Sequence, residues 1–510
     1  MPLRDLMYVA KVFEGLVIHR DLYSSKLIQL PSPRFITFYN GLEEQPERRE
    51  YHHSDAYEVR DNNPALELIV TQLNINPGYN TELMEQCPTL CQYMRYVEKI
   101  RTYEQHMTLE EAVEIQYELS LNGEVQERGI LPVEKHPARA AVCYQIPYKM
   151  PQTRGMVHLR LIYLSKGKIP YLEAGEELGF DQLCVRSESP VQKTQMRQSE
   201  TAVTQIQKNP AVKNPKTNEQ QEYICESLSF EDDGRFITIQ GNNFTYRFDG
   251  FYGVFQSLIC QGEEYLRKDM EYNFTRAEMD NDMCMKAAWE KAGYHHIKNR
   301  VKELCTDMVN GNCLIHCTQT FAPLHNRKCV DLTSVWTITP DGTICVHGDG
   351  WRNTAMPWLS RFGLRMFLDR GFEQVDYLGY GPGDAYLDKH QASWFGKFHD
   401  EVSRMHEDYI KPQENGSHFG TYRVKVSRAD GRWIEITSGQ PFSFQVSHYT
   451  QEELREKKHN FELEESPYTI LCADYKMSGI GSGSCGWAPA AEYRMEEENF
   501  SYEMTFRMGK

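Results

Sequence analysis

The sequence has little of what a membrane protein requires. None of its apolar runs reaches the roughly 18 residues that a membrane-spanning helix needs. Asp5, Lys11 and Glu14 interrupt the apolar stretch at the start of the chain, which excludes the apolar segment of a signal peptide there. We therefore expect a cytoplasmic protein with no membrane partner.

Cysteine pairs at zinc-site spacing are also missing. The 14 cysteines are scattered over 510 residues, and the closest pairs, Cys87 with Cys91 and Cys313 with Cys317, are CxxxC and not CxxC. A structural zinc site needs four converging ligands. Strand alternation puts Cys313 and Cys317 on one face with Ile315, which favours ordinary thiols in a reducing compartment. We predict no metal site and no cofactor in this chain.

The sequence also has fewer basic than acidic residues. Its 56 Lys and Arg stand against 72 Asp and Glu, for a net charge of -16. Affinity for nucleic acid comes largely from basic residues that displace counterions, so nucleic acid is not an expected partner. The residues that are present, 40% hydrophobic and 12% aromatic, indicate folded and β-rich domains.

The first hundred or so residues have an α/β pattern. Apolar residues at helical spacing predict a helix over 2–16, and a second helix is expected to begin at Pro88. Two short runs rich in β-branched and aromatic residues, at 34–41 and 64–76, predict strands. We expect a small α/β fragment over 1–113.

From Ile115 the pattern changes to short strands. Asn122-Gly123 predicts a hairpin turn, and the alternation in 156–167 puts Val157 and Leu159 on the face opposite to that of His158. The stretch 115–186 suits an immunoglobulin-like β-sandwich. It is followed by a polar segment without periodicity, 187–221, which we expect to be a linker.

The remaining stretch, 222–510, is almost entirely strand-like. Hairpin turns are predicted at Asn242-Asn243, Asp341-Gly342 and Asp430-Gly431. Only 283–293 and 451–465 have helical character. The expected fold class is mainly β: an immunoglobulin-like sandwich plus a large β-supersandwich, preceded by the small α/β fragment.

Six motifs occur in order along the last two domains. They are NFTRAEMDND at 273–282, RFGLRMFL at 361–368, GYGPGDAYLDKH at 379–390, PQENGSH at 412–418, KKHNFELEESPYT at 457–469 and GIGSGSCGW at 479–487. Together they resemble the C-terminal small-chain region of β-galactosidases of glycoside hydrolase family 2. Because the region from 115 resembles the sandwich domain that precedes it in that family, the resemblance covers about 115–508.

Two positions depart from the family pattern. The family's RAP tripeptide here ends in Glu278, and the acidic residue after GYGP is Asp384 and not the common Glu. Each change would loosen a local turn or ion pair by an amount on the order of 1 kcal/mol.

The N-terminal stretch 1–112 resembles a different family, the second half of PD-(D/E)XK transposase-associated nucleases. In that family the metal-binding carboxylates lie before the segment that corresponds to 2–16, so they would be missing here. Glu43, Glu44 and Glu47 follow a turn and are interpreted as a solvated surface. The two resemblances meet near Glu114-Ile115.

The resemblance implies that the catalytic residues of a glycosidase are not in this chain. A retaining glycosidase needs two carboxylates about 5 Å apart, and in this family both come from a barrel of about 250 residues, for which there is no room before 115. Asp280, Asp282 and Glu414 are the best carboxylates by context, but turn-forming roles are favoured for them. His390 and His418 are likewise interpreted as structural.

One substrate contact is implied by the resemblance. In the family, a loop after the GIG motif reaches the active site of the barrel and in some members places a tryptophan against the sugar. Trp487 lies close to the matching position, and a one-residue gap would put Cys485 there instead. The family's Mg and Na sites lie in the domains that this chain does not include.

The leading hypothesis is the non-catalytic C-terminal region of a β-galactosidase, a glycosidase of terminal β-galactosides such as lactose, inactive alone. Its partners would be a galactoside or a barrel-containing polypeptide. The alternatives are a carbohydrate-binding module fused to a nuclease-derived fragment, a working nuclease, and a chimera created in sequence assembly at Glu114-Ile115. The sequence leaves the oligomeric state open.

Overall fold

The structure is a computed structural model that describes residues 2–17, 28–59, 63–106, 113–133, 141, 143–167, 172–190 and 228–510. It is mainly β with a small α/β part at the N-terminus, which confirms the predicted fold class. Most of the predicted linker 187–221 lies outside the described residues. Among the described residues, no helix is both long enough and apolar enough to cross a membrane.

The chain divides into two compact units. The first comprises Met1–Glu114, Val133–Val142 and Leu164–Glu176, and the second comprises Ile115–Pro132, Cys143–Tyr163 and Glu177–Lys510. The division into four predicted domains stays a prediction.

The N-terminal unit is built on a three-stranded sheet. Its elements are α1 (Pro2–Val17), β1 (Phe35–Tyr39), β2 (Arg48–His52), β3 (Ile69–Asn74), α2 (Thr81–Gln86) and α3 (Pro88–His106). β3 lies in the centre, parallel to β1 and antiparallel to β2. Both predicted helices are present, but α1 has no fully buried residue. The second predicted strand begins at Ile69, and Leu66, expected within it, is exposed.

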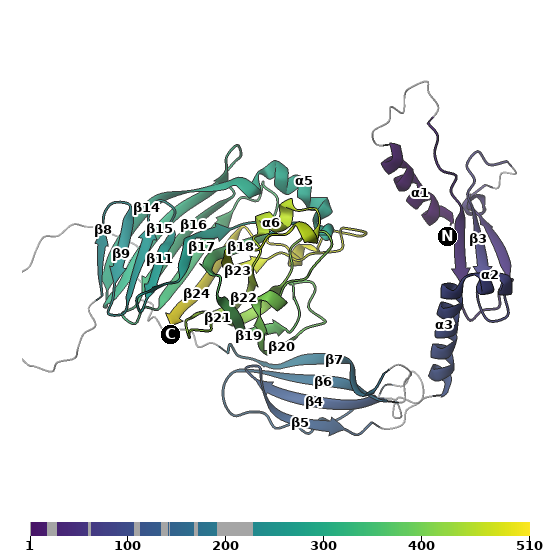
Figure 1. Ribbon diagram of the computed structural model, residues 1–510, viewed down its shortest axis with the longest axis horizontal. Coiled ribbons are helices and arrows are strands. Elements are labelled where there is room, and N and C mark those ends of the chain that lie inside the picture. The colour runs from purple at the N-terminus through teal and green to yellow at the C-terminus, as the bar shows by residue number, and fades with distance from the viewer. Residues whose placement is uncertain are drawn as a thin grey trace, which may run out of the picture. The chain divides into compact units, whose positions relative to one another are not determined.

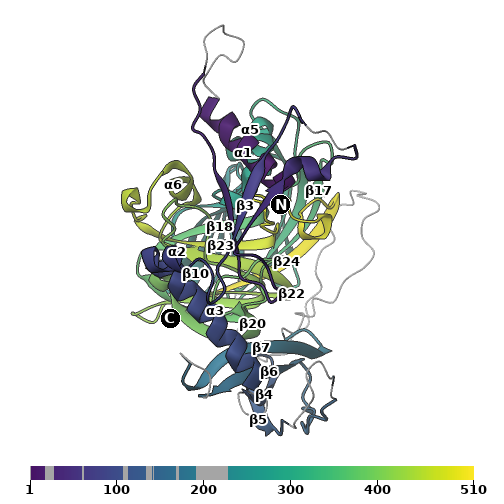
Figure 2. The same ribbon diagram turned by 90° about the vertical axis from the view of Figure 1, so that its right-hand side faces the viewer.

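A four-stranded sheet follows. Its strands are β4 (Val113–Leu121), β5 (Glu124–Leu131), β6 (Met156–Lys166) and β7 (Ala174–Ser187), and they lie side by side in the order β5-β4-β6-β7 (Figure 1, Figure 2). The hairpin between β4 and β5 is confirmed: Asn122 and Gly123 both have a positive φ, 49° and 76°, which matches the right-handed twist of the strands. One face of the sheet packs on Ile146 and Tyr148.

The expected alternation along β6 is present, but the face that carries the polar residues is buried as well. His158 and Arg160 are buried, just as Val157 and Leu159 are. His158 stacks on Phe395 with ring centroids 4.7 Å apart, and the Arg160 guanidinium lies 3.7 Å from the centroid of the Trp394 ring. Both faces of this sheet are therefore covered, the second by a strand more than 200 residues later in the chain.

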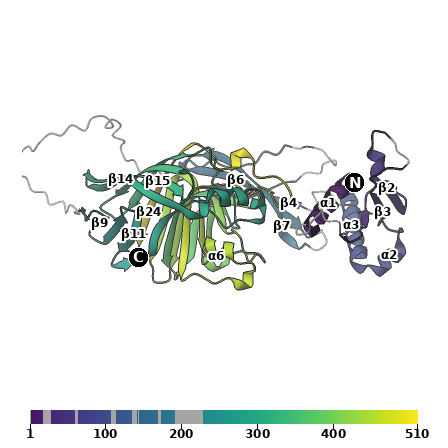
Figure 3. The same cartoon turned by 90° about the horizontal axis from the view of Figure 1, so that it is seen from above.

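The large β domain has one five-stranded and one twelve-stranded sheet. Its strands are β8 (Ser229–Asp232), β9 (Phe236–Gln240), β10 (Phe244–Asp249), β11 (Val254–Cys260), β12 (Glu263–Glu264), β13 (Leu266–Asn273), β14 (Ile297–Val309), β15 (Asn312–Pro323), β16 (Val330–Ile338), β17 (Ile344–Arg352), β18 (Arg361–Asp369), β19 (Phe372–Gly381), β20 (Trp394–Glu401), β21 (Ser417–Arg428), β22 (Trp433–Ser447), β23 (Tyr468–Met477) and β24 (Asn499–Gly509). The smaller sheet has the order β12-β11-β10-β9-β8. The main path of the larger sheet is β13-β18-β23-β22-β24-β17-β16-β15-β14. Three further strands branch from β22: β21 pairs with β22, β19 pairs with β21, and β20 pairs with β19. Figure 3 shows the long strands β14 and β15 running together.

Local signals account for much of this domain. The predicted turns at Asn242-Asn243, Asp341-Gly342 and Asp430-Gly431 join paired antiparallel strands. Helix α5 (Met283–Ala292) lies where it was predicted. The second expected helix is shorter, because α6 (Gln451–Glu456) ends at Lys457, whose backbone is extended. The core between the sheets is rich in aromatic residues, with Trp336 packed edge-on against Phe248 and Phe255.

Candidate functional site

The loop 479–487 follows β23 and carries the predicted substrate contact. Its first turn is held by Asp388, because the backbone N–H groups of Ile480 and Gly481 donate to the two carboxylate oxygens of Asp388 at 2.9 and 2.7 Å. Asp388 belongs to the GYGPGDAYLDKH motif. Two of the six motifs, about 90 residues apart, therefore meet at this loop.

Arg276 anchors the residues that enter the loop. Its guanidinium donates to the carbonyl oxygens of Ser478 and Gly479 at 2.6 and 3.0 Å, and to both carboxylate oxygens of Asp282 at 3.1 and 2.7 Å. Asp282 also accepts from the backbone N–H of Met279 at 3.0 Å. The motif RAEMDND thus folds on itself and, through Arg276, orients the start of the loop.

The middle of the loop is hydrogen-bonded to the side chain of Asn281. The side-chain amide of Asn281 donates to the carbonyl of Gly481 at 3.0 Å, and its oxygen accepts from the Ser484 hydroxyl at 2.7 Å. A Cβ atom at Gly483 would lie 2.3 Å from the carbonyl oxygen of Asn281. Glycine is required there because the two backbones approach so closely.

Trp487 stands at the end of this braced loop. Its side chain is 88% exposed, and its carbonyl oxygen accepts from the backbone N–H of Ser482 at 3.0 Å. Cys485 is exposed as well and donates its backbone N–H to Ser482. A large aromatic side chain on a loop held this firmly is available for a ligand or a partner.

A second group of buried charges lies next to the first. Arg361 makes two hydrogen bonds to Asp474, at 3.2 and 2.6 Å, and one to Glu414 at 3.1 Å; Glu414 also accepts from the backbone N–H of Ala277. Burial favours a lower pKa for Arg361, but the two carboxylates outweigh burial and raise it. Arg361 therefore stays charged, and Glu414 acts as a structural partner of the segment that follows Arg276.

Glu278, one of the two departures from the family pattern, has a partner. Its carboxylate forms an ion pair with His295 Nε2 at 2.7 Å, and both side chains are mostly buried. Burial would raise the pKa of Glu278, but the interaction with the neighbouring His295 outweighs burial, so the pKa is lowered. The ion pair ties the RAEMDND motif to the start of β14.

His390 and His418 each contact a backbone carbonyl oxygen through their ring nitrogen. His418 is buried, its Nδ1 lies 3.2 Å from the Tyr380 carbonyl oxygen, and its ring stacks on Phe444. Burial lowers the pKa of His418 to about 4, so it is neutral near pH 7. His390 Nδ1 lies 2.9 Å from the Tyr386 carbonyl oxygen. Both contacts position the chain around the GYGP segment.

No group of three or more His, Cys, Asp or Glu side chains within the described ranges is placed to hold a metal ion. Burial raises the pKa of Cys313 to about 11 and that of Cys317 to about 12, so both stay protonated thiols. Glu43 and Glu44 are exposed, and Glu47 accepts from the backbone N–H of Asn80 at 2.7 Å.

The sequence pointed to the loop but not to its supports. Asp388, Asn281 and Gly483 were not singled out, although each lies within a recognised motif. Their signal was the concentration of Gly, Asn and Asp in motifs far apart along the chain, which is typical of loops that hold each other through side-chain-to-backbone hydrogen bonds.

The large domain is similar to β-galactosidases in each of the sequence comparisons. Residues 240–508 match the family model described as Beta galactosidase small chain. The β-galactosidase of Actinobacillus pleuropneumoniae is 32% identical over 430 residues, which cover 84% of this chain and 38% of that protein. That of Staphylococcus xylosus is 32% identical over 296 residues, which cover 57% of this chain and 29% of that protein. The chain thus spans less than two fifths of these relatives.

Two further points follow from the comparisons. A match over 84% of the chain is longer than the stretch from 115 to the C-terminus, so the similarity to the Actinobacillus protein begins before the expected boundary. The predicted nuclease resemblance of 1–112 is not supported.

Among solved structures, a putative aldose 1-epimerase of Escherichia coli K12 is 10% identical with a TM-score of 0.29, covering 52% of this chain and 96% of that one. The galactose 1-epimerase of Lactobacillus acidophilus NCFM is 8% identical with a TM-score of 0.31, covering 56% of this chain and 100% of that one.

Proposed function

Because the chain belongs to the β-galactosidase small chain family, we propose that it is the non-catalytic C-terminal region of a β-galactosidase and has no activity alone. The full enzyme would hydrolyse terminal β-galactosides such as lactose. The observation that carries this proposal is the loop 479–487, whose start is held by hydrogen bonds from the buried Arg276 and which yet leaves Trp487 in solvent. Such a loop suits a scaffold that completes a site on another domain.

Trp487 is the proposed contact with the sugar. One face of a pyranose presents C–H groups, which pack on an aromatic ring and exclude water. The bracing by Asp388 and Arg276 would lower the entropy lost when the ring meets its ligand. Cys485, two residues earlier, is the alternative position and offers a much smaller apolar surface.

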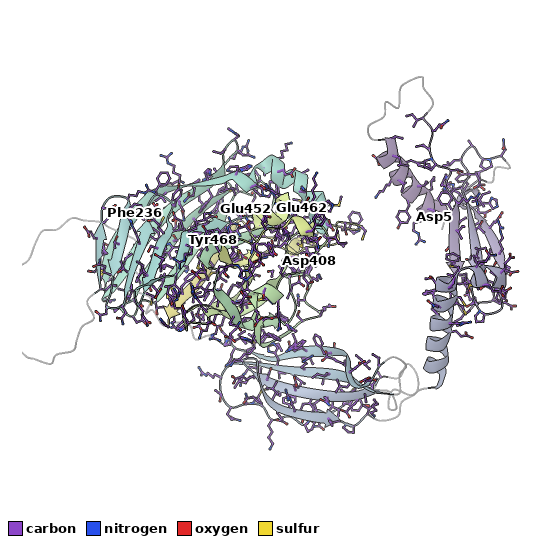
Figure 4. The ribbon with its side chains drawn as sticks, viewed as in Figure 1. Asp5, Phe236, Asp408, Glu452, Glu462 and Tyr468 are labelled. Carbon is purple, nitrogen blue, oxygen red and sulfur yellow. The ribbon has the colours of Figure 1, made fainter. Side chains whose placement is uncertain are left out.

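The partner that we propose is a polypeptide that carries the catalytic barrel. Three large apolar side chains of the last domain are exposed: Met283, which begins α5 directly after Asp282, is 67% exposed, and Ile410 and Phe461 are 79% and 81% exposed. The segments of Ile410 and Phe461 are joined by a hydrogen bond from Asn460 N–H to the Ile410 carbonyl at 3.0 Å. Asp408 and Glu462, labelled in Figure 4, mark these segments. Apolar residues of this size favour a protein interface.

A complementation assay tests this proposal. The purified chain is mixed with a fragment that carries the part of a β-galactosidase that this chain does not span, and hydrolysis of a chromogenic galactoside is followed. We expect activity only in the mixture. The Trp487→Ala variant should still assemble, as judged by sedimentation, and should raise the KM for the galactoside. Assembly with unchanged kinetics would remove Trp487 from the site.

Several finer statements stay predictions. The Mg and Na ions of the enzyme would be bound by the catalytic fragment, and the location would be cytoplasmic. The comparisons do not favour a carbohydrate-binding module fused to a nuclease-derived fragment. Amplification of genomic DNA across Glu114-Ile115 tests the assembly chimera: a product of the expected length excludes it.

A further inference from the structure

Strand β1 stands at one end of the three-stranded sheet of the N-terminal unit, whose central strand β3 is labelled in Figure 1. Among the described residues, no strand pairs with the outer side of β1. Its five residues, FITFY, carry no charge. Every other strand that the structure describes at the end of a sheet contains at least one charged residue: β2, β5, β7, β8, β12, β13, β14 and β20. Charged side chains on a sheet edge oppose pairing with another chain, and β1 has none.

The outer side of β1 presents the backbone groups of Ile36 and Phe38. The carbonyl oxygen of Tyr39 accepts from the backbone N–H of Ile75 at 2.9 Å, so the backbone groups of Tyr39 face β3. Because these groups alternate in direction along a strand, those of Ile36 and Phe38 face away from β3. Their N–H and C=O groups are therefore placed to pair with a further strand.

The side chains at this edge are apolar and half in solvent. Ile36 and Phe38 are 55% and 50% exposed. They lie on the same face of the sheet as Thr71 and Leu73, their neighbours on β3 in the parallel pairing. A strand that pairs with β1 would cover part of both side chains and remove apolar surface from water, which favours association.

The β1 strand of a second copy fits this edge. An antiparallel pairing centred on Thr37 sets Ile36 of one copy opposite Phe38 of the other, and Phe35 opposite Tyr39. Pairs of aromatic residues, and of aromatic with β-branched residues, are favourable across strands. In this register the outward N–H and C=O groups of each copy meet those of the other as hydrogen-bonded pairs.

Charge also favours a second copy. Arg34 directly precedes β1, so in this pairing it lies next to the end of β1 in the other copy. At that end the Tyr39 hydroxyl donates to the carbonyl oxygen of Glu43 at 2.9 Å, which keeps the acidic segment 43–47 close. Arg34, Glu43 and Glu44 are all exposed. The symmetry therefore brings opposite charges together on both sides of the contact.

We propose that this chain forms a symmetric dimer in which the β1 strands of two copies pair antiparallel about Thr37 and join two sheets into one. A contact of this kind uses the same surface on both copies and is complete with two. The charged strand β2, at the other end of the sheet, opposes further growth. The inference does not rest on the proposed function.

Sedimentation of the full chain over a wide range of concentrations tests the dimer. We expect the mass to rise from one chain to two and no further. Ile36→Lys combined with Phe38→Lys sets like charges directly opposite each other and should weaken the association by roughly tenfold or more. The matched control is Glu50→Lys on β2, an exposed position, which changes the net charge by the same amount and should leave the association unchanged. Circular dichroism checks that both variants keep the fold.

Thr37→Cys tests the register. Facing residues of a non-hydrogen-bonded antiparallel pair have Cα atoms about 4.5 Å apart, a separation that a disulfide can span. With oxidised glutathione as the oxidant, we expect a disulfide between the two copies at position 37, identified by mass spectrometry of the linked peptides. Thr71→Cys, on the central strand β3, should give no such link.

Three outcomes would overturn the dimer: a single-chain mass at every concentration, association that the folded double lysine variant keeps in full, or no link at position 37. If the double lysine variant does not fold, the link at position 37 decides. A single-chain mass together with loss of binding to a barrel-containing fragment in the folded double lysine variant would assign the edge to that fragment. The second copy would then be rejected and the proposed function kept.

Discussion

Arg276 and Asp282 form a two-point ion pair whose side chains are 0% and 1% exposed, and the same guanidinium holds the carbonyl groups of Ser478 and Gly479. The seven residues from Arg276 to Asp282 thereby position a loop 200 residues later. Because every N–H group that Arg276 uses is out of solvent, its partners cannot be replaced by water.

Removal of Asp282 should destabilise the large domain severely. Asp282→Ala leaves a buried arginine without its counter-charge, and we expect a loss of roughly 3 to 5 kcal/mol in the free energy of unfolding. Denaturant unfolding measures it. The matched control is Asp400→Ala at the surface pair with Arg404, whose guanidinium is mostly exposed; less than about 1 kcal/mol is expected there. Equal losses in both variants would contradict the role given to Asp282.

Substitution of Gly483 should disturb the loop more than the fold. A Cβ at this position meets the Asn281 carbonyl oxygen at 2.3 Å, so Gly483→Ala must push the loop away, at a cost of about 1 to 3 kcal/mol. We expect faster proteolysis within 479–487 and weaker complementation. Gly383→Ala, where a Cβ meets nothing within 4 Å, is the control. Identical behaviour of the two variants would show that the loop is not held against Asn281.

Stability should fall as the pH is lowered from 7 to 5, in part because of His418. Its pKa in the folded protein is about 4 because of burial, below the value of roughly 6.5 in an unfolded chain. Protons therefore bind the unfolded chain more tightly, and the stability contributed by the neutral ring is lost as the pH falls from about 6.5 towards 4. The loss should be roughly 2 kcal/mol at pH 5.

Urea unfolding of the wild type and of His418→Gln at pH 7.5 and pH 5 measures this effect. The variant should be less stable at pH 7.5, because it loses the stacking on Phe444, but its stability should change less between the two pH values. An unchanged pH dependence would show that His418 does not contribute to it.

The N-terminal unit should be the first part to be digested. Helix α1 has no fully buried residue, and Leu3, Met7 and Val12 are each more than half exposed. A segment with so little burial opens at low free energy. Limited proteolysis followed by mass spectrometry should show cuts in 2–106 while 228–510 remains whole. Earlier cleavage in the large domain would contradict this order.

Features that depend on neighbouring residues could be predicted from the sequence. Asn122-Gly123 and Asp430-Gly431 form hairpin turns because their backbone conformation is a local property. Helix α5 lies within 283–293, the stretch to which the sequence gives helical character. The end of α6 was missed: beyond the extended Lys457, the backbone N–H groups of Lys458 and His459 donate to the side chain of Glu462, a contact that helix propensity does not report.

Features that need distant partners could not be predicted. The burial of His158 and Arg160 could not be predicted, because their partners, Phe395 and Trp394, lie more than 200 residues later. For the same reason the motifs indicated the loop 479–487 but gave no role to Asp388, which contacts it across about 90 residues.

Turnover by the purified chain alone tests the central claim most directly. The chain at high concentration is incubated with a chromogenic β-galactoside, with Mg²⁺ and Na⁺ supplied, and release of the chromophore is followed for hours. We expect a rate equal to that of buffer, and turnover only after a barrel-containing fragment is added. Hydrolysis by the chain alone that scales with its concentration and co-purifies with it would contradict the account.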